Sequence, residues 1–310
     1  MNLRKTLAFT LFLVFVASVL HAQATARVGA WNIEWLGVPG SRSGSAKNVK
    51  QQASDIADYI IDSNVDILGL EEVSLNGPNN TNVTIAEALN LVKARTGNTW
   101  KHVLFTKPSG DANQRIGVAW NTARATIGEI FKIPVPSSTP QAGSIWERHP
   151  HAVQFRFLGS GNTPKTDVVI VVLHMKSNRQ GNPPPKVKRE HEARTLVAKL
   201  PDIRQKFHDT DIIILGDSNI LDDQERAAQI YVSAGFRDLN QEDEATHIGQ
   251  GSAPFDRAFV AKNQPELVGD QTVFDAEYLS PNRITKGQFR KRFSDHFMVI
   301  VPVKVMADDD

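Results

Sequence analysis

The sequence predicts an α/β fold in which two packed β-sheets are flanked by helices. Strand-like apolar segments alternate with amphipathic helical segments in the first and last thirds of the chain, whereas the middle third contains strand-like segments only. A length of 310 residues allows one large α/β domain or two small ones. No internal repeat or long linker is visible, so we expect one domain over residues 27–305.

The central strand is expected within residues 211–219, which read DIIILGDSN. The apolar run 212–215 is typical of a strand buried on both faces, and Gly216 tolerates the dihedral angles of a sharp turn. Asp217 and Asn219 follow at the carboxyl end of this strand, where α/β proteins bind their ligands. Taken alone, the segment is equally compatible with an ordinary turn.

Other strands are expected where short apolar runs are bounded by turn-forming residues. These runs are 27–33, 65–70, 100–105, 116–120, 126–133, 151–157, 168–175, 256–260 and 296–303. Helices are expected at 46–63, 84–96, 186–200 and 223–235. Asp222 and Asp223 are candidates to cap the last of these helices.

The two ends of the chain differ from the expected domain. Two basic residues precede an apolar run over residues 7–20, which is followed by the small residues Ala22 and Ala24. This order predicts a secretory signal peptide over residues 1–24, cleaved near one of these alanines, and a secreted or periplasmic protein. An N-terminal membrane anchor is the alternative, but the run is short for a membrane span. We expect an acidic tail at 306–310.

Composition limits the chemistry that is available. The chain has 35 basic and 34 acidic residues, and the leader holds two of the basic ones, so the mature chain is nearly neutral. Attraction to nucleic acid must therefore be local rather than global. The absence of cysteine excludes thiolate metal sites and thiol nucleophiles. Any metal would be held by oxygen or imidazole ligands.

Polar side chains that can bind a metal or transfer a proton lie beside the ends of nearly all the predicted core strands. They are Asn32, Glu34, Glu72, His174, Asp217, Asn219, Asp256, Asp295 and His296. If these strand ends converge, the site combines carboxylates, amides and two imidazoles. Such oxygen-rich ligands suit Mg²⁺, Mn²⁺ or Ca²⁺ better than a structural zinc ion.

Seven short motifs follow one another in an order that resembles the endonuclease/exonuclease/phosphatase superfamily. They are WNIEWL at 31–36, LGLEEV at 68–73, RHP at 148–150, LHMKS at 173–177, GDSN at 216–219, FDR at 255–257 and SDH at 294–296. Each motif alone is weak, but the ordered series covers essentially the whole mature chain. The resemblance implies the DNase I-like fold, a four-layer α/β sandwich of two mixed β-sheets flanked by helices.

The resemblance also implies a metal site that acts on a phosphodiester. Glu72 is the expected ligand of Mg²⁺ or Mn²⁺, with Ca²⁺ as a further option, and Asp295 and Asn32 support it. Glu34 is expected to contribute directly or through water. Such a cation neutralises the phosphate and stabilises the leaving oxygen.

The same resemblance assigns catalytic roles. Asp217 orients or deprotonates the attacking water, and Asn219 donates to a phosphate oxygen. His296 faces the scissile phosphate, and Asp256 accepts the other N–H of its ring, which favours the imidazolium. His174 corresponds to a second active-site imidazole, for which a purely structural role is the alternative.

Two further residues belong to that comparison. Arg148 matches a phosphate-binding arginine, and its planar guanidinium suits bidentate contact. The carboxylate that partners His174 in pancreatic-type DNases has no clear counterpart, and Asp111 is only a loose candidate.

Plainer interpretations apply to several neighbouring residues. Glu71 is expected to face away from Glu72, because neighbours alternate across a strand. His149 and His151 are expected at the surface rather than as ligands. Asp256 has the alternative of a surface pair with Arg257.

Local positive charge favours a nucleic acid substrate. A basic cluster of Lys286, Arg290, Lys291 and Arg292 directly precedes the SDH motif. Lys176 and Arg179 follow His174 and add to this charge. We expect a track for phosphate groups, with Arg290 and Arg292 among its members, although a solvated loop explains the cluster equally well.

We therefore expect a secreted, metal-dependent DNA endonuclease of low specificity, with RNA as a further substrate. A sphingomyelinase-like or sugar-phosphate phosphodiesterase or phosphatase is the enzyme alternative, since this fold hosts all of them. An inactive secreted binding protein is the alternative from another class. No aromatic run for membrane docking is visible, so we expect no stable membrane association, and we expect a monomer.

Overall fold

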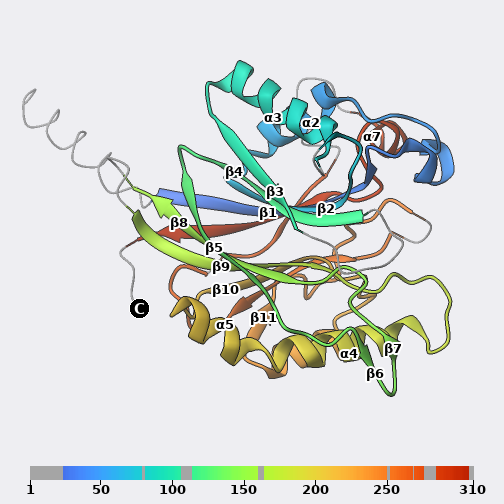
Figure 1. The fold of residues 1–310 in the computed structure, drawn as a ribbon, viewed down its shortest axis with the longest axis vertical. Coiled ribbons are helices and arrows are strands. Elements are labelled where there is room, and N and C mark those ends of the chain that lie inside the picture. Colours follow the sequence, from blue (N-terminus) through green and yellow to red (C-terminus); the bar gives the residue numbers. More distant parts are fainter. Residues whose placement is uncertain are drawn as a thin grey trace, which may run out of the picture.

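The computed structural model describes residues 24–78, 81–105, 114–159, 164–249, 252–267, 269–275 and 284–306. The expected leader up to residue 23 and residues 307–310 of the expected tail lie outside this part of the chain. The described residues form two six-stranded sheets packed face to face, with helices on both outer faces (Figure 1).

The first sheet is mixed. In spatial order it contains β13 (Thr272–Phe274), β14 (Met298–Val305), β1 (Ala24–Leu36), β2 (Ile67–Ser74), β4 (Gln114–Asn121) and β3 (Trp100–Leu104). Strands β1 and β2 are parallel, and the other neighbouring strands are antiparallel. Because β1 and β2 run the same way, the polar residues near their carboxyl ends lie at the same edge of the sheet.

The second sheet is mixed in the same manner. It contains β11 (Phe236–Asp238), β12 (Asp256–Ala261), β10 (Ile212–Asp217), β9 (Pro164–His174), β8 (His151–Leu158) and β5 (Ala125–Lys132). Here β9 and β10 form the parallel pair. A short hairpin of β6 (Ser138–Thr139) and β7 (Gly143–Ser144) lies apart from both sheets.

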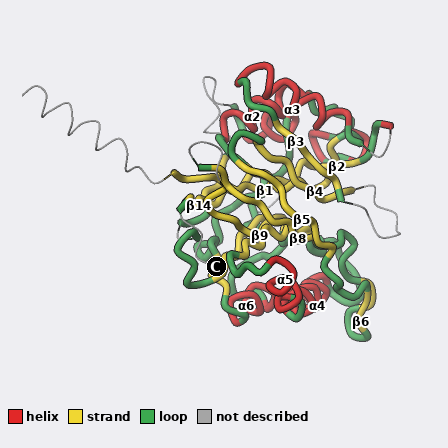
Figure 2. The backbone as a smooth tube through the Cα atoms, turned by 60° about the vertical axis from the view of Figure 1, so that its left-hand side comes forward, coloured by secondary structure: helices red, strands yellow, loops and turns green. Residues whose placement is uncertain are grey.

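Helices complete the four layers (Figure 2). The first sheet is covered by α2 (Ala53–Ser63), α3 (Val83–Thr96) and α7 (Lys286–Arg292), and the short helices η1 (Pro39–Ser41) and η2 (Gly44–Ala46) precede α2. The second sheet is covered by α4 (Pro185–Val197), α5 (Leu200–Phe207) and α6 (Arg226–Ser233). Within the described ranges, none of the helices has the length and apolar character needed to cross a membrane.

The central strand β10 is buried on both faces, as its sequence predicts. Ile213 and Leu215 belong to the hydrophobic core between the two sheets. Ile212 and Ile214 belong to the core between the second sheet and its helices. Successive side chains of a strand point to opposite faces, so a continuous apolar run serves two cores at once.

Several element boundaries differ from the expectations. The helix expected at 46–63 begins only at Ala53, because the segment before it is held in an irregular path. The side chain of Gln51 donates there to the carbonyl oxygens of Ile33 at 2.6 Å and of Phe293 at 2.7 Å. These long-range contacts outweigh the local helical pattern of residues 46–52.

Two other helices also differ from the expectations. The helix expected at 186–200 is α4, which ends at Val197, and a second helix, α5, which was not expected, follows from Leu200 to Phe207. The helix expected at 223–235 begins at Arg226 after Glu225, so neither Asp222 nor Asp223 caps it. Helix α7 was not expected at all.

Candidate active site

Strand register aligns three of the expected site residues across the second sheet. Asp217 at the end of β10 lies opposite His174 at the end of β9. On its other side, Asp217 lies opposite Asp256 at the start of β12. One imidazole and two carboxylates therefore occupy neighbouring positions at one edge of the sheet.

The first sheet brings its own polar residues to the same place. Trp31 is fully buried, and its Nε1 donates to the carbonyl oxygen of His296 at 3.0 Å. Ser294 donates through Oγ to the carbonyl oxygen of Asn32 at 2.6 Å, and the His296 N–H donates to Ser294 Oγ at 3.0 Å. The SDH segment is thereby fixed against β1.

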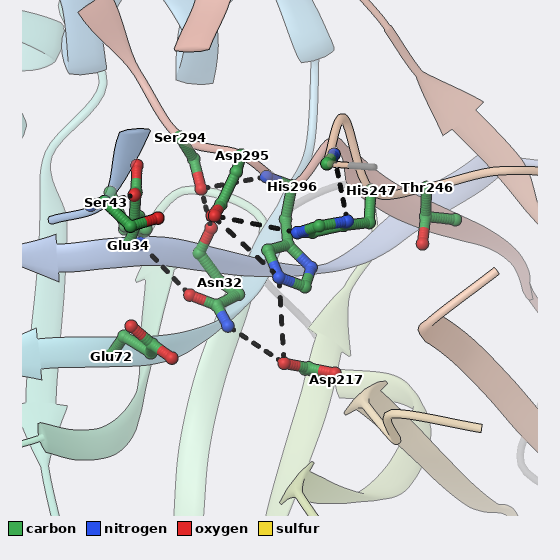
Figure 3. Close-up of polar contacts among 12 residues, drawn as sticks. Asn32, Glu34, Ser43, Glu72, Asp217, Thr246, His247, Ser294, Asp295 and His296 are labelled. Carbon is green, nitrogen blue, oxygen red and sulfur yellow. Dashed lines mark hydrogen bonds and ion pairs between the residues drawn. The ribbon is translucent and has the colours of Figure 1, made fainter. Parts of the chain in front are cut away.

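Asn32 connects the two sheets (Figure 3). Its Nδ2 donates to Asp217 Oδ2 at 3.0 Å, and its Oδ1 accepts the Glu34 N–H at 3.0 Å. Asn32 is almost fully buried, so both contacts form away from bulk water. The side-chain oxygen Oδ1 has a second lone pair for a metal ion, and Nδ2 links the first sheet to the second through Asp217.

His296 is surrounded by carboxylates. Its Nδ1 lies 2.8 Å from Asp256 Oδ2, and its Nε2 lies 3.8 Å from Asp217 Oδ2 and 4.0 Å from Asp295 Oδ1. Burial alone would lower the pKa of His296, but the three carboxylates together raise it well above the ordinary value. This environment favours the imidazolium form of His296.

Asp256 pairs with His296 and not with Arg257, so the alternative of a surface pair is wrong. Arg257 is itself buried and forms ion pairs with Asp238, at 2.9 Å, and with Asp243. Residues 256 and 257 are neighbours on one strand and point to opposite faces, which separates their partners.

The acidic residues Glu34, Glu72 and Asp295 form a second group on the other side of the site. Burial and then the nearby Asp295 carboxylate raise the pKa of Glu72 to about 7. The same two causes raise the pKa of Glu34, and Arg42 partly offsets them. Glu72 Oε2 accepts the Trp35 N–H at 3.2 Å, which fixes its orientation. We call Glu34, Glu72 and Asp295 the acidic triad.

The acidic triad is suited to a divalent cation. Burial and then repulsion from Asp295 raise the pKa of Glu72 and Glu34. Burial would also raise the pKa of Asp295, but His247, His296 and Arg290 lower it to about 2. A bound cation would remove this repulsion, and carboxylate and amide oxygens are the ligands that Mg²⁺ and Mn²⁺ prefer. Asp295 lies close enough to Glu72 and Glu34 to raise the pKa of both, and Asn32 accepts the Glu34 N–H, so the residues of the expected ligand set lie in one region of the site.

His174 lies between the two groups. Its Nε2 is 3.6 Å from Glu72 Oε1 and 3.5 Å from Asp217 Oδ2. Burial, followed by the charges of Arg148 and His296, lowers its pKa well below the ordinary value, which favours the neutral form of His174. Its Nδ1 is buried and has no hydrogen-bond partner in the described ranges. Asp111, the loose candidate for that partner, lies outside those ranges.

The expected substrate-binding residues lie beside His174. Arg148 Nη2 donates to the Met175 carbonyl at 2.8 Å, and its Nη1 donates to Glu147 at 3.0 Å. Lys176 Nζ donates to the same Glu147 carboxylate at 2.8 Å. Asn219 adopts a left-handed conformation with φ of 54°, and its N–H donates to Asp217 Oδ1 at 3.0 Å.

The basic cluster does not form the continuous track that we expected. Arg290 Nη2 faces the acidic triad, 3.4 Å from Asp295 Oδ2 and 3.7 Å from Glu34 Oε1. Arg292 instead forms an ion pair with Asp55 of α2. Both arginines belong to helix α7, where residues two apart point to nearly opposite sides.

The sequence analysis missed two residues that hold this site together. Thr246 Oγ1 donates to Asp256 Oδ2 at 2.6 Å and accepts the Asp256 N–H at 2.9 Å. His247 Nδ1 accepts the Gly249 N–H at 3.0 Å, so its Nε2 carries the proton of the neutral ring. That Nε2 lies 3.6 Å from Asp295 Oδ2. His247, Asp295 and His296 also offer ligand atoms close enough together for a metal ion, but this tautomer favours donation to Asp295.

Buried groups were also missed elsewhere. Glu71 is fully buried, and its Oε2 accepts the Asp217 N–H at 2.8 Å, so it supports the strand end from between the sheets. His149 and His151 are buried and not at the surface; His151 stacks on Phe105 at 4.4 Å between ring centroids. Nothing in the local sequence distinguishes these burial states.

Comparisons with known proteins give a fold. No protein-family model and no curated protein matches the sequence. An endonuclease/exonuclease/phosphatase family protein from Bacteroides thetaiotaomicron matches with a TM-score of 0.58 at 16% identity, over 90% of this chain and 97% of that chain. The human Nocturnin catalytic domain with bound sulfate anion matches with a TM-score of 0.57 at 16% identity, over 90% of this chain and 93% of that chain. A mannosyl-6-phosphatase from B. thetaiotaomicron matches with a TM-score of 0.58 at 17% identity, over 90% of this chain and 99% of that chain.

Identities this low establish architecture rather than activity. The matches extend over nearly the full length of both partners, and both six-stranded mixed sheets of this chain belong to the shared architecture. The chain therefore has the DNase I-like fold of the endonuclease/exonuclease/phosphatase proteins.

Proposed function

We propose that this protein is a secreted or periplasmic phosphoesterase that depends on a divalent metal ion and hydrolyses phosphodiesters of DNA. One observation carries the proposal: a buried imidazolium, His296, lies at the same strand ends as the acidic triad. A phosphodiester is an anion with a poor leaving group, and it requires positive charge on both sides of the phosphorus.

The metal ion would be held by Glu72 and Asp295, with Asn32 and Glu34 in support. When bound, it would neutralise a phosphate oxygen and stabilise the leaving oxygen. The identity of the ion is proposed as Mg²⁺ or Mn²⁺ because the donors are hard oxygen atoms.

The remaining steps fall to the chain's own groups. His296 would donate from Nε2 to a phosphate oxygen, while Asp256 holds its Nδ1. Asp217 would orient the attacking water and accept its proton. Burial and then Asp256 raise the pKa of Asp217, partly against the effect of His296, which makes it a stronger base than an exposed aspartate. The Asn219 side chain would donate to the phosphate from the next position.

Positive charge beside the site supports a nucleic acid substrate. Arg148, Lys176 and Arg179 line the same pocket as Glu72 and His174. A small phosphorylated sugar is the second candidate, because that pocket is compact and one structural neighbour is a mannosyl-6-phosphatase. The Nocturnin domain, with its bound sulfate, adds that a protein of this fold accepts a tetrahedral anion.

The first experiment measures nicking of supercoiled plasmid DNA. We expect cleavage with Mg²⁺ or Mn²⁺ and none with EDTA. His296→Asn should abolish it, whereas the matched control His208→Asn, at the exposed end of α5, should not. Asparagine tolerates the left-handed conformation at position 208, so the control preserves the fold.

Other substrates separate the alternatives. Intact plasmid together with phosphocholine released from sphingomyelin would move the assignment to lipid substrates. Intact plasmid together with phosphate released from sugar monophosphates would make the protein a phosphatase. If no phosphoester is turned over while phosphate ligands still bind, the protein is an inactive binding protein.

A further inference from the structure

A pocket of about 340 Å³ opens directly onto the candidate active site. Its lining includes Glu72 and His174 from the site, and Trp35, Arg148, Lys176 and Arg179 beyond it. The volume lies within the range of pockets that enclose small ligands. A group bound in this pocket would therefore lie next to the phosphate that His296 and the acidic triad are positioned to bind.

Trp35 forms an aromatic wall that the core does not use. It is only half-buried, and within the described ranges it packs against neither hydrophobic core, unlike Trp31, Trp120 and Trp146. Its φ of 56° is unfavourable for a bulky side chain, and such conformations cluster at ligand sites. The backbone N–H of Trp35 donates to Glu72, so this conformation is connected to the acidic triad.

Cationic side chains line the same pocket as Trp35. Glu147 accepts hydrogen bonds from both Arg148 and Lys176, which holds these two cations beside the pocket. Arg179 is exposed and forms no ion pair with any residue that the structure describes, so its charge is available to a ligand. An aromatic face combined with neighbouring cations is the combination that binds the bases and phosphates of single-stranded nucleic acids.

We propose that this pocket binds the nucleotide adjacent to the scissile phosphate. Its base stacks on Trp35, and its own phosphate contacts Lys176 and Arg179. The inference rests on the proposed phosphodiesterase function and extends it to substrate selection. Only a polynucleotide carries both a neighbouring base and a neighbouring phosphate, so the pocket selects nucleic acid over simple diesters and over single sugar phosphates.

The test compares two substrates with the metal-loaded enzyme: a fluorescein-labelled DNA octanucleotide and methyl p-nitrophenyl phosphate, a diester without base or flanking phosphate. Trp35→Ala should lower kcat/KM for DNA about tenfold more than for the simple diester, and Trp35→Phe should restore most of the loss. Arg179→Gln should lower kcat/KM for DNA several-fold. The dependence of kcat/KM for DNA on salt concentration should become shallower by the amount that corresponds to about one phosphate contact.

Arg156→Gln is the matched control for charge. Arg156 is exposed on β8. It lies opposite Asp167, at the far end of β9 from His174, so Arg156→Gln should leave kcat/KM for both substrates unchanged. An equal loss on both substrates for Trp35→Ala, or no loss on either, would overturn the proposed pocket while leaving the phosphodiesterase function intact.

A binding measurement separates the two proposals. Fluorescence anisotropy of the labelled octanucleotide in EDTA needs no turnover, and Trp35→Ala should weaken binding about tenfold. If the wild-type protein hydrolyses neither substrate but Trp35→Ala still weakens DNA binding, the proposed phosphodiesterase function is wrong and the proposed nucleotide pocket is supported. If DNA binding is identical in wild-type and Trp35→Ala protein, the pocket proposal is wrong.

Discussion

The two sides of the candidate site place their charges in opposite ways. On one side, the carboxylates of the acidic triad face one another, and burial raises the pKa of Glu72 to about 7. On the other side, the carboxylates Asp217 and Asp256 surround His296 and raise its pKa instead. The cations beside the acidic triad, Arg42 and Arg290, lie at its edge, whereas the imidazole of His296 lies among the carboxylates of the other side. This difference is the basis for proposing a metal ion on the first side and a proton donor on the second.

The largest expected effect comes from the side that supplies its own cation. His296→Asn should lower kcat for phosphodiester cleavage by about 1,000-fold or more, because it removes a charge-bearing donor from the transition state. Circular dichroism should show an unchanged fold. A near-normal rate would mean that the imidazolium does not face the phosphate.

The next effect concerns the support of the acidic triad. Arg42 is fully buried, donates to Glu34 Oε2 at 2.9 Å from Nη2, and also contacts the Lys291 carbonyl from Nη1 at 3.0 Å. Arg42→Met leaves Glu34 buried without its partner, so the free energy of unfolding should fall by about 3 kcal/mol. Urea denaturation measures this, with Arg95→Met as the control. Arg95 forms a surface pair with Asp58, and its loss should cost under about 1 kcal/mol.

A smaller effect follows from the raised pKa of Glu72. Below pH 7 its carboxyl group holds a proton that the cation must displace, and above pH 7 it does not. Affinity for Mg²⁺ should therefore fall about tenfold between pH 8 and pH 6 in calorimetric titrations. Glu72→Gln should bind the ion more weakly and lose this pH dependence. A flat profile in wild-type protein would place the metal elsewhere.

The smallest expected effect distinguishes the two arginines of α7. Arg292→Gln should change the rate of DNA cleavage by less than about twofold, because Arg292 pairs with Asp55 away from the site and surface pairs contribute little. Arg290→Gln should alter Mg²⁺ affinity, since Arg290 contacts the acidic triad. A tenfold loss in the rate of DNA cleavage for Arg292→Gln would instead support the continuous basic track expected from the sequence.

The sequence by itself determined the layers and the strand ends at which the polar residues gather. In β10, the apolar run, the glycine at position 216 and the polar residues after it are all local features of the sequence. Because side chains alternate along a strand, the apolar run fills the cores on both faces and the polar residues lie at the end of the strand. The ordered motifs predicted which strand ends matter, and Asp217, His174 and Asp256 do lie on neighbouring strands.

Only the tertiary structure decided which charges meet. Thr246 reaches Asp256, and His247 faces Asp295, through a loop whose path no local pattern specifies. Likewise, α7 turns Arg290 toward the acidic triad and Arg292 away from it. Burial and charge pairing arise from contacts between residues far apart in the chain, and these contacts set the pKa values that give each side of the site its chemistry.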